Sequence, residues 1–83
     1  MKAEIGKYYR HYKNGETYLV VAIGRDSDTL EELVVYEGQY DSKEFGKNPV
    51  WTRSRKEFEE KVIFDGKKVP RFTNSSRSDS IKK

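Results

Sequence analysis

Short β-prone runs separated by turn residues limit what this chain can fold into more than any other feature of its sequence. Asn14-Gly15 stands between two such runs and is the strongest short-range signal of a β-hairpin, because both turn positions need φ > 0. The run that follows, residues 16–23, is apolar on both faces over much of its length, which favours a strand wrapped inside a small barrel over an edge strand. The expected strands span residues 7–13, 16–23, 32–37, 50–53, 62–64 and 68–72.

One short helix is expected between the fourth and fifth of these strands. Ser54 and Glu57 form a capping box, in which the serine side chain accepts a hydrogen bond from the amide of Glu57. The helix should then run over residues 55–61. Phe58 and Val62 are four residues apart, so they are expected on the face that packs inward.

A chain of 83 residues buries only about 60% of its unfolded surface, which is enough for a single core. Five or six short strands, one short helix and a long connection at residues 38–48 predict a mainly β fold: a small, SH3-like, partly open antiparallel barrel. A curled antiparallel sheet with the helix over one end is the alternative. Residues 1–72 form this domain, with Pro70 excluding the last strand from a central position. The polar, serine-rich residues 73–83 are expected to be a disordered tail.

The composition excludes several classes of protein. There is no cysteine, so disulfide frameworks and cysteine zinc sites are excluded. No apolar run approaches the roughly 18 residues that would span a bilayer, and the first residues carry no apolar stretch typical of a signal peptide. We therefore expect a cytoplasmic, monomeric protein that engages no membrane and uses no metal and no cofactor.

The net charge of +3 conceals a segregation of charge along the chain. Residues 1–25 carry +3, residues 26–44 carry −6, residues 45–72 carry +4 and residues 73–83 carry +2. A nucleic-acid binder that is basic throughout would not show this pattern. A domain with one acidic and one basic side would, although solvated acidic loops are the simpler explanation.

Aromatic and cationic residues occur together on the first strand and again on the later strands. Alternate residues of a strand share a face, so Tyr8 and Arg10 are expected on the face opposite His11. Bases stack on aromatic rings, and guanidinium groups bind phosphate or carboxylate through two parallel hydrogen bonds. The candidate ligand-binding residues are Arg10, His11, Tyr12, Trp51, Arg53 and Arg71.

The same residues also have a purely structural explanation. Small barrels fill their cores with aromatic side chains, and the stems of Arg and Lys lie over them. The arginines would then form internal salt bridges, with Glu31, Glu32 or Glu37 as partners. The aromatic residues expected in such a core are Trp51, Phe58, Phe64 and Phe72.

Three functions remain open at this point. A non-enzymatic binding module for an anionic or planar ligand, such as a nucleotide or RNA, is slightly favoured over an SH3-like module that binds a protein partner. The first needs accessible arginines, whereas the second needs Tyr8, Tyr12 and Trp51 in one exposed groove. An enzyme would use His11 with a carboxylate as an acid–base pair, but no spacing singles out a partner for this histidine.

Three blocks of residues follow one another in a specific order: Tyr8-x-Arg10-His11-Tyr12-Lys13, Trp51-x-Arg53 and Pro70-Arg71-Phe72. Together with the residues between them, over residues 6–72, they resemble the bacterial family known as domain of unknown function 1653. The resemblance implies a short bacterial protein of uncharacterised activity, and its signature blocks contain most of the candidate residues. Members of that family usually have a proline directly after the tryptophan block, where this chain has Ser54, so the start of the helix differs.

Overall fold

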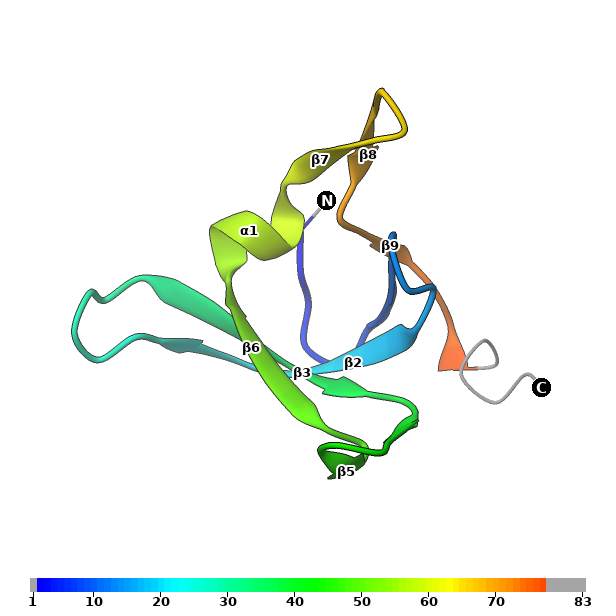
Figure 1. Ribbon diagram of the computed structural model, residues 1–83. Coiled ribbons are helices and arrows are strands. Elements are labelled where there is room, and N and C mark those ends of the chain that lie inside the picture. Colours follow the sequence, from blue (N-terminus) through cyan, green and yellow to red (C-terminus); the bar gives the residue numbers. More distant parts are fainter. Residues whose placement is uncertain (1, 78–83) are drawn as a thin grey trace.

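The computed structural model describes residues 2–77 of the chain (Figure 1). The elements are β1 (Tyr8–His11), β2 (Thr17–Arg25), β3 (Glu32–Gly38), β4 (Asp41–Ser42), β5 (Gly46–Lys47), β6 (Val50–Ser54), α1 (Arg55–Glu59), β7 (Lys61–Phe64), β8 (Lys67–Pro70) and β9 (Phe72–Asn74). Five strands form one antiparallel sheet in the order β6-β3-β2-β1-β9, while β4–β5 and β7–β8 are separate hairpins. The predicted mainly β, antiparallel fold with one short helix is confirmed, and the five-stranded sheet does not close into a barrel.

The strand β2 lies at the centre of the sheet, as its two apolar faces predict. It pairs with β1 on one side and with β3 on the other. The pairing with β3 shifts by one residue between Val20 and Ala22, so Val21 is an extra residue in the ladder. Such a bulge bends a strand and increases its twist, and this helps the sheet to curve around the core.

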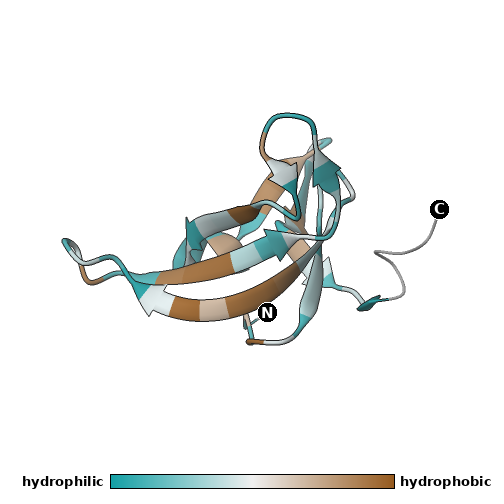
Figure 2. Cartoon of the chain, turned by 90° about the horizontal axis from the view of Figure 1, so that it is seen from below, coloured by the Kyte–Doolittle hydropathy of each residue, from teal (hydrophilic) through white to brown (hydrophobic). Residues whose placement is uncertain are grey.

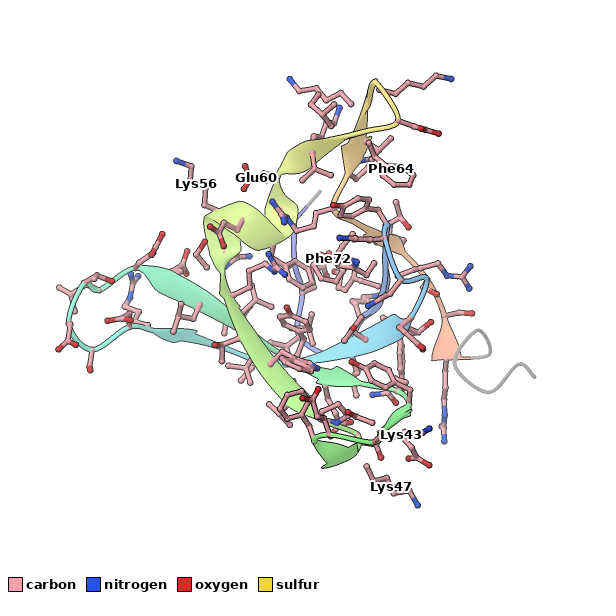
Figure 3. All side chains as sticks on the ribbon, viewed as in Figure 1. Lys43, Lys47, Lys56, Glu60, Phe64 and Phe72 are labelled. Carbon is pink, nitrogen blue, oxygen red and sulfur yellow. The ribbon has the colours of Figure 1, made fainter. Side chains whose placement is uncertain are left out.

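Aromatic rings form most of the core. The buried apolar residues are Ala3, Tyr9, Tyr18, Val20, Val34, Tyr36, Phe58 and Phe72. Phe72 lies inside the curve of the sheet (Figure 3) and stacks on Phe58 with ring centroids 4.0 Å apart. Hydrophobic residues concentrate in the middle of the strands, and the hairpin ends are largely hydrophilic (Figure 2). The core prediction is correct for Phe58 and Phe72 but wrong for Phe64, which is 47% exposed.

The two Gly-containing hairpin turns differ from each other. At Asn14-Gly15 only Gly15 has positive φ, and a loop of four residues connects β1 to β2 because His11 and Glu16 face each other. The expectation of positive φ at both positions is therefore wrong at this turn. It holds instead at Asp65-Gly66, where φ is 57° and 76°, so β7 and β8 are joined by the two-residue turn that suits strand twist.

The helix α1 begins as predicted and ends early. The side chain of Ser54 accepts a hydrogen bond from the amide of Glu57 at 3.1 Å. The helix stops at Glu59 rather than at residue 61, because Glu60 is extended and its carbonyl accepts a hydrogen bond from the amide of Arg71. The expected inner-face partner of Phe58, Val62, consequently belongs to β7.

The expected last strand is divided at Arg71. β8 ends at Pro70, whose nitrogen has no proton to donate, and β9 then pairs with β1. Thr73 and Asn74, which the sequence assigns to the tail, lie in β9. Residues 78–83 of the expected tail lie outside the described residues. The expected long connection at residues 38–48 contains the small β4–β5 hairpin. No helix among residues 2–77 has the length and apolar character needed to cross a membrane.

Candidate ligand-binding pocket

Strand pairing brings three of the predicted site residues to one pocket. His11 at the end of β1 lines this pocket together with Trp51 and Arg53 of β6, which alternate along that strand and so share its inner face. The pocket has a volume of about 240 Å³. Its lining side chains are His11, Asn14, Tyr18, Tyr36, Tyr40, Trp51 and Arg53.

Arg53 contributes the one permanent charge among these lining residues. Its Nε donates a hydrogen bond to the hydroxyl of Tyr36 at 3.3 Å. Within residues 2–77, its two terminal nitrogens form no hydrogen bond or salt bridge. The charge-bearing end of the guanidinium is therefore available to a ligand.

His11 is held in one orientation by the backbone and by neighbouring rings. Its Nδ1 accepts a hydrogen bond from the amide of Lys13 at 3.2 Å, and its ring meets the edge of Phe72 at 5.0 Å. Burial lowers the pKa of His11, and the nearby charges of Arg53, Arg71 and Lys13 lower it further. The imidazole is therefore neutral at pH 7, and because Nδ1 is an acceptor, Nε2 carries the proton as a donor.

Three tyrosines, Tyr18, Tyr36 and Tyr40, form a further part of the pocket wall. The hydroxyl of Tyr18 accepts a hydrogen bond from Nδ2 of Asn14 and shares another with Tyr40, both at 3.1 Å. Burial raises the pKa of Tyr18, and the hydrogen bond with Tyr40 raises it further, so this phenol stays protonated. Gly38 makes room for Tyr40, because a Cβ atom at Gly38 would lie 2.5 Å from the tyrosine ring.

Trp51 closes the pocket on the β6 side. Its ring meets Phe45 edge-to-face at 5.2 Å. The indole nitrogen is buried and has no hydrogen-bond partner in the part of the chain that the structure describes. Buried donors are nearly always paired in native proteins, so this N–H is an unsatisfied donor in the wall of the pocket.

The chemistry of the pocket follows from what lines it. No carboxylate is among its seven lining side chains, while a guanidinium, an imidazole N–H and phenol hydroxyls are. Rings offer faces and edges to a planar group. The arrangement suits a ligand that combines a negative charge with a flat ring. No cluster of residues within 2–77 has three or more groups that could hold a metal ion.

The other three predicted site residues lie elsewhere. Arg10 is exposed on the face of β1 opposite the buried Tyr9, as strand alternation predicts. Tyr12 is in the turn after β1 and contacts both His11 and Phe64. Arg71 is engaged by α1 and the residue after it: its Nε donates to the carbonyl of Glu57, and Nη2 forms a salt bridge with Glu60 at 3.3 Å.

Four lining residues were not predicted: Asn14, Tyr18, Tyr36 and Tyr40. A signal for one of them exists in the sequence, since Tyr36 alternates with the buried Val34 along β3. Tyr36 is also the direct cross-strand partner of Trp51. That pairing depends on strand register, which sequence alternation leaves undetermined.

Comparison with known proteins agrees with the resemblance read from the sequence blocks. The family model described as "Protein of unknown function (DUF1653)" matches residues 7–74. A crystal structure of a DUF1653 protein from Bordetella bronchiseptica is 32% identical, with a TM-score of 0.72 and 88% of each chain covered. None of the curated proteins compared matches this chain.

Proposed function

Since this chain belongs to the DUF1653 family of unknown function, we propose from its pocket that it is a non-enzymatic binding module for an anionic ligand with a planar ring, a nucleotide or a nucleotide of RNA. The observation that carries this proposal is the state of Arg53. Its terminal nitrogens have no carboxylate partner among residues 2–77, and it stands at a pocket lined by aromatic rings. A phosphate would pair with the guanidinium, and the base would contact the rings.

His11 supports binding rather than acid–base catalysis. A histidine acting as a general base must present an unprotonated nitrogen to the reacting group. Here Nδ1 is occupied by the amide of Lys13, and Nε2 carries the proton. The neutral imidazole is therefore a second donor for the anion beside Arg53.

The alternative of a peptide-binding groove is less favoured. It requires Tyr8, Tyr12 and Trp51 on one surface, but Tyr8 lies on the face of β1 opposite His11 and lines a separate hollow with Glu4 and Lys7.

We also propose that this ligand-binding domain is SH3-like and that it acts as a monomer in the bacterial cytoplasm. Its lack of cysteine suits a reducing compartment.

Trp51 provides the test, because it is the only tryptophan of the chain and lines the pocket. Its fluorescence would be followed at low salt during titration with adenosine or uridine 5′-monophosphate and with the uncharged nucleosides. The nucleotides should bind with a dissociation constant between about 10 µM and 1 mM. Nucleosides should bind at least about tenfold more weakly, because a charge-assisted hydrogen bond is lost.

The matched pair of variants is Arg53→Gln and Arg10→Gln, which remove the same charge from the pocket and from the opposite face of β1. Arg53→Gln should lower nucleotide affinity by about tenfold or more. Arg10→Gln should change it by less than about threefold, through long-range charge alone. Equal affinity for nucleotide and nucleoside, or equal behaviour of the two variants, would refute the proposal.

A further inference from the structure

A row of contacting rings leads out of the pocket. His11 contacts Tyr12 with ring centroids 4.9 Å apart, and Tyr12 contacts Phe64 of β7 at 5.3 Å. Tyr12 is half-buried and Phe64 is 47% exposed. The row therefore connects the pocket with the β7–β8 hairpin, which contains Phe64 and projects away from the sheet (Figures 1 and 3).

The register of this hairpin determines which side chains accompany Phe64. Phe64 and Lys67 are direct cross-strand partners, so they share a face, whereas Ile63 and Lys68 are partners on the opposite face. Because Phe64 contacts Tyr12, the face with Lys67 is the one that continues the row of rings. The amide of Tyr12 donates to the carbonyl of Arg71 at 3.0 Å, which ties the row to the closing segment.

The surroundings of the row are cationic. Residues 60–71 contain four Lys or Arg and two acids, Glu60 and Asp65, for a net charge of +2. Lys13 adds a further cation directly after Tyr12, while Glu60 is engaged in the salt bridge with Arg71. The most acidic segment, residues 26–44, lies mainly in the β2–β3 and β4–β5 hairpins, which extend in other directions (Figure 1).

Aromatic rings with cations beside them are typical of surfaces that bind single-stranded nucleic acid. We propose that the pocket binds one nucleotide of a single-stranded nucleic acid and that the neighbouring nucleotides extend over Tyr12 and Phe64 towards Lys67. This inference rests on the proposed function and specifies its ligand as a strand instead of a free mononucleotide. With one nucleotide in the pocket and one on each of the two rings outside it, such a strand would engage about three nucleotides.

The first test is the dependence of affinity on length. Mononucleotide, di-, tri- and hexanucleotides of uridine and of deoxythymidine would be titrated into the full chain at several salt concentrations. Affinity should rise with each nucleotide up to about three and then level off. The two sugar series decide whether the strand is RNA or DNA, since a 2′-hydroxyl contact would favour the uridine series.

The second test uses two matched pairs on the hairpin. Phe64→Ala should lower trinucleotide affinity about 5- to 100-fold, and Ile63→Ala should leave it unchanged. Lys67→Gln should reduce the slope of log affinity against log salt by about 0.7, the value for one phosphate contact of a single strand, and Lys68→Gln should not. Circular dichroism verifies that each variant is folded. If Phe64→Ala does not fold, the comparison of Lys67→Gln with Lys68→Gln still tests the proposal.

The outcomes separate this inference from the proposed function. Binding of mononucleotides with no gain from added length overturns the strand inference and leaves the pocket proposal intact. A gain with length that is affected equally by Phe64→Ala and Ile63→Ala, with equal salt slopes for the two lysine variants, overturns this path. Absence of binding by mononucleotide and hexanucleotide alike overturns both.

Discussion

Arg53 and Arg55 are two residues apart in the sequence but differ in the partners that the protein provides for their guanidinium groups. Arg55, at the start of α1, bonds to the carboxylate of Glu59 at 2.9 Å, to that of Glu32 at 3.4 Å and to the carbonyl of Ala3 at 2.9 Å. Arg53, near the end of β6, has one hydrogen bond to the phenol of Tyr36. Each of the three nitrogens of the Arg55 guanidinium has a protein acceptor, whereas within residues 2–77 only Nε of Arg53 has one.

The difference follows from the secondary-structure element that carries each arginine. A helical residue and the residue four positions later lie on one face, so α1 supplies Glu59 to Arg55 automatically. A strand directs alternate residues to one face, so Arg53 follows Trp51 towards the tyrosines and meets no acid there. The partners of each arginine therefore depend on whether it lies in the helix or in the strand, although the two residues are close in the sequence.

The largest expected effect is on stability, from the substitution of Arg55. Arg55→Ala should lower the free energy of unfolding by about 2 kcal/mol, because three hydrogen bonds involving a charge are lost and Glu59 loses its partner. Arg53→Ala should change it by less than about 0.5 kcal/mol. Urea unfolding measures both, and equal losses would contradict the comparison.

The acid dependence of stability sharpens the same contrast. Burial would raise the pKa of Glu59, but hydrogen bonds from the Ala3 amide and the Arg55 guanidinium outweigh it and lower that pKa. A carboxylate with a lowered pKa contributes stability above its ordinary pKa and loses it as pH falls through the folded-state value. This acid-induced loss should shrink in Glu59→Gln and persist in Arg53→Ala.

A smaller effect is expected on the pocket side from Gly38→Ala. The added Cβ would meet the Tyr40 ring at 2.5 Å, and overpacking of this kind costs about 1–3 kcal/mol, less where a ring can move away. Tyr40 should move, so nucleotide affinity should fall together with stability. Retained affinity in Gly38→Ala, measured by Trp51 fluorescence, would mean that Tyr40 is not part of the binding surface.

The smallest effect concerns His11 and pH. Burial and the charges of Arg53, Arg71 and Lys13 lower the pKa of His11, so its contribution to stability is present above its ordinary pKa and lost as pH falls through the folded-state value. A bound anion offsets those charges and raises this pKa. Affinity for a dinucleoside monophosphate, whose phosphodiester does not titrate in this range, should therefore increase modestly as pH falls below the ordinary histidine value. His11→Gln should abolish the increase, and an unchanged pH profile would exclude His11 from the site.

The sequence predicts strands better than it predicts which side chains meet. Turn residues and β-prone runs identify the strands because these are local properties. The position of Tyr36 opposite Trp51 is not local, since it depends on the register of β3 with β6. Likewise, Arg71 meets Glu60 only because α1 ends at Glu59 and exposes the next residue to the closing segment. The sequence therefore identifies His11, Trp51 and Arg53 as candidate site residues, but it does not identify the tyrosines that line the same pocket.

The most direct measurement of the central claim observes the arginine side chains themselves. In ¹H–¹⁵N spectra of the guanidinium groups at low salt, addition of uridine 5′-monophosphate should shift the Arg53 signal in a saturable manner. The Arg55 and Arg71 signals should stay in place, because protein acceptors already occupy those groups. An unmoved Arg53 signal, or equal shifts of all three, would contradict the assignment of Arg53 as the group that binds the anion.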